Sequence, residues 1–183
     1  MTRFNRSLAG FLGRFGVDRR GVSAVEFALL APVMILLYFS LAEACQAYMA
    51  QKRAGHVNAI VGDLIAQYET VDDETITKAF EISSLIMRPF SDTGLAQRVT
   101  SVTRDDEGVA RVDWSQADGM DELAEDDPVD IPDDLIENGQ TLIMTEVEYD
   151  YDSPVDYLLP NGIVFDFQSY LRPRRTDFIP YTS

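Results

Sequence analysis

Hydrophobic residues follow three different spacings along the chain. Residues 27–42 form one uncharged apolar run of 16 residues. Over residues 49–69, apolar positions recur every three or four residues, which leaves one apolar face on a helix. Farther along, residues 141–151 and 163–171 alternate between apolar and polar positions, as half-buried strands do. The pattern predicts an apolar helix, an amphipathic helix and then a β-rich part.

The middle of the chain carries signals for a second helix and a hairpin. Apolar residues at helical spacing predict a helix over about residues 73–87, which Pro89 ends. Short strands are predicted at 98–104 and 109–115, joined by a turn at 105–108. The predicted fold class is therefore α+β. A long N-terminal transmembrane helix continues into an amphipathic helix, which packs on a small antiparallel sheet.

The apolar run is close to the length that crosses a bilayer. Its 16 residues span roughly 24 Å as a helix, whereas the hydrocarbon core is about 30 Å thick. A spanning helix would therefore extend over residues 22–48 and would include Glu26 and Glu43 near its ends. The positive-inside rule places Arg19 and Arg20 in the cytoplasm and the chain after about residue 48 outside.

Charge divides the chain at the same place. The formal net charge is −16, but residues 1–21 carry +4 and the remaining residues carry −20. So acidic a chain is not expected to bind nucleic acid, which needs a basic patch. One cysteine and one histidine argue against a disulfide within the chain, a Cys-based zinc site and a Ser–His hydrolase. We therefore expect no enzymatic activity, no catalytic residue, no cofactor and no metal site.

Two interpretations of the N-terminal segment do not use Glu26. A secretory signal peptide would be cut near residues 42–44, although the apolar region is longer than a typical signal core. An unprocessed single-pass anchor with a periplasmic interaction domain accounts for the length and the arginines. It does not account for Glu26, because a carboxylate in a membrane helix is costly.

A third interpretation uses Glu26. A basic stretch with Arg19 and Arg20, then Gly21, then a Glu five residues later resembles the prepilin peptidase site of type IV pilins. In that family the peptidase cuts after the Gly at the cytoplasmic face, which here falls between Gly21 and Val22. Glu26 would become the fifth residue of the mature chain. Its carboxylate could then pair with the new α-ammonium group of Val22 or of a neighbouring subunit, because opposite charges attract strongly at low dielectric.

The longer segment 21–48 resembles the TadE/TadG-like family of the tight-adherence (Tad, Flp) pilus system. Members of that family begin with Gly, small residues and Val-Glu-Phe-Ala, followed by a Pro and by a Glu near the outer end. The corresponding positions here are Gly21, residues 25–28, Pro32 and Glu43. Pro32 either bends the helix to fit a bundle of pilin helices or is a tolerated kink. The chain is too short for the extra domain of TadG-type members, so a TadE-like minor pilin (pseudopilin) is the closer fit.

The resemblance implies a pilin-like protein of the bacterial inner membrane, with its N-terminus in the cytoplasm and its C-terminal domain in the periplasm. The implied partners are the inner membrane, the prepilin peptidase and other pilin and pilus-assembly subunits. The expected domains are a basic leader (1–21), a transmembrane helix (22–48), a periplasmic helix extension (49–69) and a periplasmic α+β head (70–183). The sequence leaves open whether the leader is cleaved and whether the chain enters the fibre or remains in the assembly machine.

An acidic segment lies within the predicted head. Residues 104–156 contain 19 acidic residues and two arginines, and residues 116–139 are predicted to be a surface loop with little periodicity. The loop could be a solvated face, an electrostatic docking surface for a basic partner, or a calcium site. No EF-hand pattern supports calcium.

A basic cluster follows near the C-terminus. Arg172, Arg174 and Arg175 are three of the ten basic residues after position 21. We expect them to pair with carboxylates of the same chain or of another subunit. Pro173, which lies among them, predicts an extended edge strand.

Overall fold

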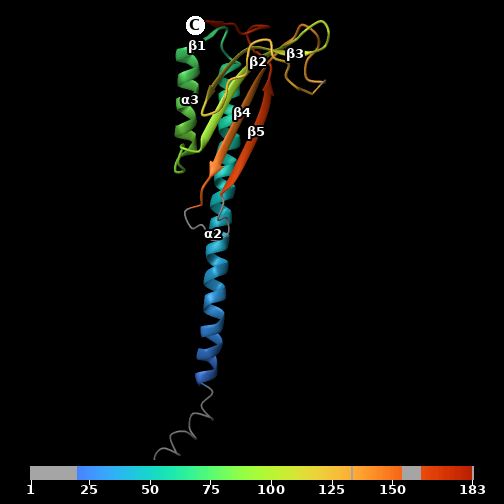
Figure 1. Ribbon diagram of the computed structural model, residues 1–183. Coiled ribbons are helices and arrows are strands. Elements are labelled where there is room, and N and C mark those ends of the chain that lie inside the picture. Colours follow the sequence, from blue (N-terminus) through green and yellow to red (C-terminus); the bar gives the residue numbers. More distant parts are fainter. Residues whose placement is uncertain (1–19, 133, 154–161, 183) are drawn as a thin grey trace, which may run out of the picture. The chain divides into compact units, whose positions relative to one another are not determined.

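The computed structural model describes residues 20–132, 134–153 and 162–182 (Figure 1). Most of the predicted basic leader lies outside these residues. The chain divides into two compact units, Met1–Glu43 and Ala44–Ser183. Helix α2, Arg20–Ile65, supplies the described part of the first unit and the first element of the second.

In the N-terminal unit, α2 exposes large apolar side chains all around the helix. Phe27 is 72 % exposed and Leu29 is 70 % exposed, and the same holds for the other large apolar residues from Val22 to Leu41. A helix that is apolar on every side is typical of a membrane span. By length and composition α2 is able to cross a membrane. The predicted long apolar helix is confirmed.

The C-terminal unit is built on a four-stranded antiparallel sheet in the order β3-β2-β4-β5. Its strands are β2 (Leu95–Arg104), β3 (Ala110–Asp118), β4 (Thr141–Tyr151) and β5 (Ile163–Leu171). Helix α3 (Asp73–Met87) precedes the sheet, and the short strands β1 (Val71–Asp72) and β6 (Tyr181–Thr182) pair in parallel. The predicted α+β fold with a small antiparallel sheet is confirmed.

The core of this unit lies between the helices and one face of the sheet. Along α2, one row of mostly small residues is buried: Ala47, Ala50, Ala54, Val57, Val61 and Ile65. The facing residues of β4, among them Ile143 and Val147, are also buried. α3 lies alongside α2, where Arg53 Nη1 donates a hydrogen bond to the carbonyl of Ile86 (2.7 Å). Small side chains on α2 let the helix approach the sheet closely.

Two expectations at the ends of elements are wrong. α2 ends at Ile65 rather than continuing to residue 69, and Tyr68, near the end of the predicted extension, is exposed. The amides of Gln67 and Tyr68 bond to carbonyls three residues back, the tighter turn with which many helices end. Pro173 does not lie in an edge strand, because residues 172–180 are irregular and only β6 follows them.

The acidic segment is more than a solvated surface loop. Residues 119–132 and 134–140 are irregular, but Ile131 and Ile136 are buried against Leu142 and Met144 on the second face of the sheet. Apolar residues spaced through the segment therefore form a second, smaller core. The carboxylates between them remain mostly exposed.

Candidate functional site

The residues of the predicted processing site lie in the first two turns of α2. Val22 is 56 % exposed, Glu26 is exposed, and a side chain added at Gly21 would meet nothing within 4 Å. The backbone at Gly21 is helical. The site is thus accessible from every side among the described residues.

Glu26 places a carboxylate on an otherwise apolar helix surface. It is the only charged residue between Gly21 and Ala42. A carboxylate inside a membrane is costly unless it pairs with a cation, and intramembrane carboxylates usually face a partner. The arrangement therefore favours an interaction of Glu26 with a positively charged group.

Pro32 and Glu43, the two other residues of α2 that the sequence pointed to, differ in their surroundings. α2 continues through Pro32 without interruption. The Glu43 side chain is fully buried, with 0 % of its surface exposed. Glutamate is rarely buried completely, so Glu43 stands apart from the exposed acids of the C-terminal unit.

In the C-terminal arginine cluster, two arginines contact other segments of the same unit. Arg174 pairs with the Asp63 carboxylate, and its backbone N–H donates to the carbonyl of Ala66 (2.9 Å). Arg172 Nη2 donates to the carbonyl of Leu135 (2.8 Å). Arg175 lines a surface hollow of about 460 Å³ beside the end of α2. The cluster thus fastens the C-terminal segment to α2 and to the acidic segment.

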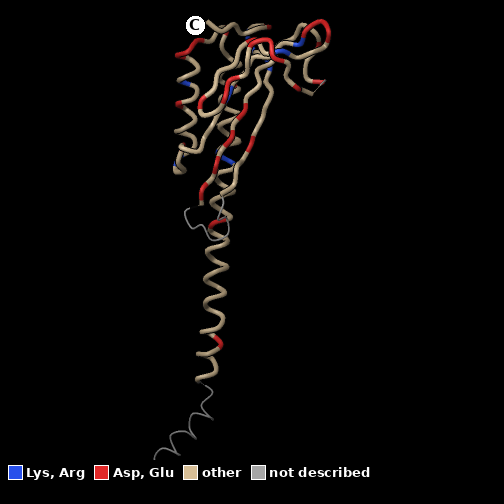
Figure 2. Tube along the Cα trace, viewed as in Figure 1, with Lys and Arg blue, Asp and Glu red and all other residues tan. Residues whose placement is uncertain are grey.

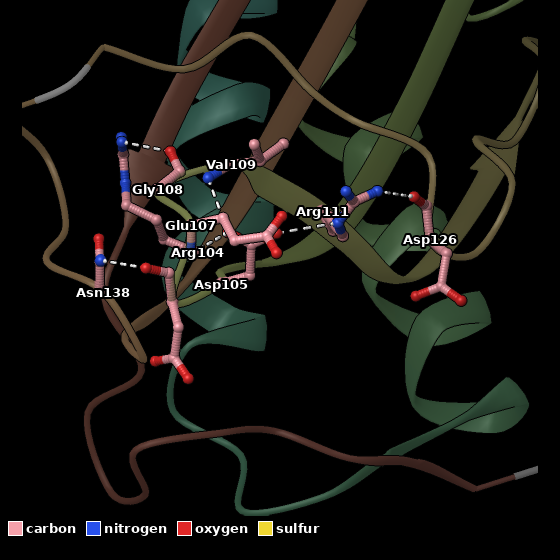
Figure 3. A network of polar contacts seen from close by, with 9 residues as sticks. Arg104, Asp105, Glu107, Gly108, Val109, Arg111, Asp126 and Asn138 are labelled. Atoms are coloured by element: carbon pink, nitrogen blue, oxygen red, sulfur yellow. Dashed lines mark hydrogen bonds and ion pairs between the residues drawn. The ribbon is translucent and has the colours of Figure 1, made fainter.

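A network of polar contacts holds the turn between β2 and β3 (Figure 3). The Asp105 carboxylate accepts hydrogen bonds from the backbone N–H of Val109 (2.8 Å) and of Glu107 (2.9 Å), and from Arg111 Nε (3.0 Å). The Val109 N–H is the main cause that lowers the pKa of Asp105, and Arg111 adds to it. Arg111 also donates to the carbonyl of Asp126 (3.1 Å). Asp105 and Asp126 of the acidic segment therefore help to hold the turn between β2 and β3 in place.

The remaining candidate ligands are dispersed. In the described ranges, no three His, Cys, Asp or Glu side chains come together in a way that could hold a metal ion. His56 lies exposed on α2, as a surface residue. Figure 2 shows acidic residues spread over the C-terminal unit rather than gathered at one point.

Sequence patterns did not reveal several contacts that fix the C-terminal segment. Trp114 Nε1 donates to the carbonyl of Ile179 (2.8 Å). The Tyr181 hydroxyl donates to the Asp73 carboxylate, and this hydrogen bond is the main cause that raises the pKa of Tyr181 to about 12. These partners are far apart in the sequence, so no local pattern could have shown them.

Together, the fold and the N-terminal helix define an α+β protein in which the described residues include one candidate membrane-spanning helix. Residues 21–57 match the family model described as TadE-like protein. The matched segment contains Gly21, Glu26, Pro32 and Glu43, and over it the resemblance to the TadE-like family is confirmed. No curated protein and no solved structure matches the chain.

Proposed function

We propose that this chain is a TadE-like minor pilin (pseudopilin) needed for assembly of a Tad/Flp pilus, and that a prepilin peptidase cuts it after Gly21. The observation that carries the proposal is the TadE-like match, which begins at Gly21 and continues to residue 57. The start of the match coincides with the Gly after which the cut is proposed. The exposed apolar surface of α2 up to Leu41 supports insertion of the subunit into a membrane.

The proposed topology follows from charge. Arg19 and Arg20 precede the apolar helix and are assigned to the cytoplasmic side of the inner membrane. The acidic C-terminal unit is assigned to the periplasm. Its proposed partners are other pilin and pilus-assembly subunits. The proposal covers both a subunit of the fibre and a subunit that remains in the assembly machine.

The proposed role of Glu26 is to bind an N-terminal ammonium group. Cleavage after Gly21 would create that group on Val22, one helical turn from Glu26. A neighbouring subunit would supply the same group. Because each charge alone is costly in an apolar layer, pairing them would favour one axial register between subunits.

The proposal assigns no catalytic activity. A nucleophile needs a neighbouring base, and the chain has one histidine and one cysteine. The function is therefore proposed to be that of a structural subunit, which acts by binding other proteins.

Intact-mass measurement of the chain, expressed with and without an active prepilin peptidase, tests the proposed cleavage. We expect a product that begins at Val22 only when the peptidase is active. Gly21→Leu should prevent the cut, whereas Gly16→Leu, a matched change in the leader, should leave it intact. A full-length mass in the presence of active peptidase would contradict the proposal and favour the unprocessed anchor.

Glu26→Ala tests the pairing role separately. We expect cleavage and membrane insertion to persist while the number of pili per cell falls strongly. Glu69→Ala, which removes an exposed carboxylate from the turn after α2, serves as the matched control and should leave pili unchanged. Normal piliation in Glu26→Ala cells would refute the proposed role of Glu26.

A further inference from the structure

The two edges of the four-stranded sheet differ in how they are covered. β3 forms one edge, and residues 126–129 of the acidic segment run along the first part of this strand. The Val112 N–H donates to the Asp127 carbonyl (3.1 Å), and the Asp126 N–H donates to the Val112 carbonyl (2.9 Å). A further bond joins the Val129 N–H to the Ala110 carbonyl (2.9 Å). Backbone groups of this edge strand are thus satisfied by a covering segment.

β5 forms the other edge of the sheet, and among the described residues this edge is open. It pairs with β4 in continuous register from Ile163 to Leu171, without a bulge. On its other side, none of the described residues pairs with it. Every second residue of such a strand directs its N–H and C=O away from the sheet. β5 also contains no Lys and no Pro, the residues that commonly protect an edge from pairing.

The inner face of β5 continues the apolar surface of the sheet to this edge. Phe165 and Phe167 are half-buried, whereas their partners on β4, Tyr149 and Val147, are at most 4 % exposed. Burial therefore decreases from the centre of the sheet toward the edge. Alternate apolar side chains of an added strand would cover the parts of Phe165 and Phe167 that remain exposed.

The outer face at this edge is acidic. Asp166 lies directly opposite Glu148 in the register, and both residues are exposed. Like charges opposite each other are unfavourable in a sheet. Arg98 on the same sheet is already engaged, because its Nε lies 2.7 Å from the Glu146 carboxylate. A cation placed between Asp166 and Glu148 would relieve their repulsion.

We propose that the open edge of β5 binds an extended segment of a partner protein by strand addition, and that this segment alternates basic and apolar residues. Its backbone would satisfy the outward N–H and C=O groups of β5. Its basic side chains would meet Asp166 and Glu148, and its apolar side chains would cover Phe165 and Phe167. A second copy is disfavoured as the occupant, because the chain carries a formal net charge of −16 and two copies would repel each other. The inference is independent of the pilus assignment.

Hydrogen exchange of the β5 amides tests the inference on the full chain in phosphatidylcholine nanodiscs. The probe is a synthetic peptide of alternating Lys and Val that matches the nine residues of β5 in length. We expect the outward amides of β5 to exchange rapidly without peptide and to become protected with it. Two control peptides should not protect them: one with Glu in place of Lys, and one N-methylated at alternate residues, which cannot form the ladder.

Asp166→Lys tests the charge selection. We expect it to weaken binding of the Lys–Val peptide about five- to tenfold, since it replaces an exposed attraction by a repulsion. Glu107→Lys, a matched change in the β2–β3 turn, should have no such effect. Absence of β5 protection, equal binding of the Glu peptide, or equal binding of the N-methylated peptide would overturn the inference. Concentration-dependent protection without any peptide would also overturn it and would indicate a second copy at the edge.

Discussion

Replacing Gly62 with alanine tests whether small residues set the distance between α2 and the sheet. A Cβ atom at this position would lie 2.5 Å from Leu171 Cδ1 and 3.1 Å from Thr145 Cγ2. Leu171 is half-buried and has a flexible end that is able to move. Thr145 is fully buried, and its hydroxyl bonds to Ser169 Oγ (2.6 Å) and to the Asn58 carbonyl (3.3 Å). Thr145 therefore resists displacement.

Two opposing effects determine the result. Alanine in a helix interior is favoured over glycine by about 1 kcal/mol, whereas overpacking a close interface costs about 1–3 kcal/mol. At Gly62 we expect the second effect to prevail, with a net destabilisation of about 1 kcal/mol. Gly55→Ala is the matched control on the same helix, because the atoms nearest to its Cβ would belong to the half-buried ring of Phe167, the closest at 3.1 Å. That ring is able to shift, so the control should be neutral or slightly stabilising.

Urea unfolding of the full chain in detergent measures both variants. Trp114 is the single tryptophan of the chain and is buried in the C-terminal unit, so its fluorescence reports unfolding of that unit. The expected order of stability is Gly55→Ala at or above wild type and Gly62→Ala below it. Equal stabilisation by both substitutions would refute the idea that Gly62 sets the helix–sheet distance.

Three further predictions concern the C-terminal unit. Gly94→Ala should destabilise it by more than about 2 kcal/mol in the same assay, because the new Cβ would lie 2.4 Å from the backbone carbonyl oxygen of Asp150, which cannot move without breaking the sheet. Trp114→Phe should cost about 1–3 kcal/mol in thermal unfolding followed by circular dichroism, since it leaves the carbonyl of buried Ile179 without its donor. Asp105 has a lowered pKa, so its ionised form stabilises the fold above its ordinary pKa of 3.8, and that stabilisation is lost as the pH falls below it. Asp105→Asn should therefore be less stable than wild type at pH 7, and urea unfolding at several pH values should show the difference shrinking below about pH 4.

The bounds of two strands could be predicted closely from the sequence. The alternation over 141–151 and 163–171 coincides with the bounds of β4 and β5. β2 and β3 are longer than predicted, because Leu95 pairs with Tyr149 and Gln97 pairs with Asp118. Those extensions depend on neighbouring strands and leave no local pattern.

The second core was present in the sequence as a weak signal. Leu142 and Met144 are apolar on the face of β4 that an alternating strand would leave polar. Their burial requires a covering segment, which Ile131 and Ile136 provide. These two isoleucines stand among carboxylates without a regular period, so their burial could not be deduced from the acidic segment alone.

The candidate sites differ in how they depend on the fold. The match at Gly21 and Glu26 is local, since both residues lie within the six consecutive residues 21–26, and a sequence pattern was enough to find it. The open edge of β5 depends on which strand is last in the sheet. That order results from pairing between residues far apart in the chain and became visible only in the structure.

The first part of α2 exposes large apolar side chains, whereas the second part has a row of buried side chains. Substitutions in the two parts should therefore have different effects. Phe27, in the first part, is 72 % exposed, so Phe27→Ala removes apolar area without leaving a cavity. Ala54, in the second part, is fully buried, so Ala54→Leu overpacks the core at a cost of about 1–3 kcal/mol. We therefore expect Ala54→Leu to lower the urea midpoint reported by Trp114, and Phe27→Ala to leave that midpoint unchanged. Phe27→Ala should instead make the chain easier to extract from membranes, because anchoring depends on the apolar area in contact with lipid. A lowered midpoint for Phe27→Ala would show that the first part of α2 also stabilises the C-terminal unit.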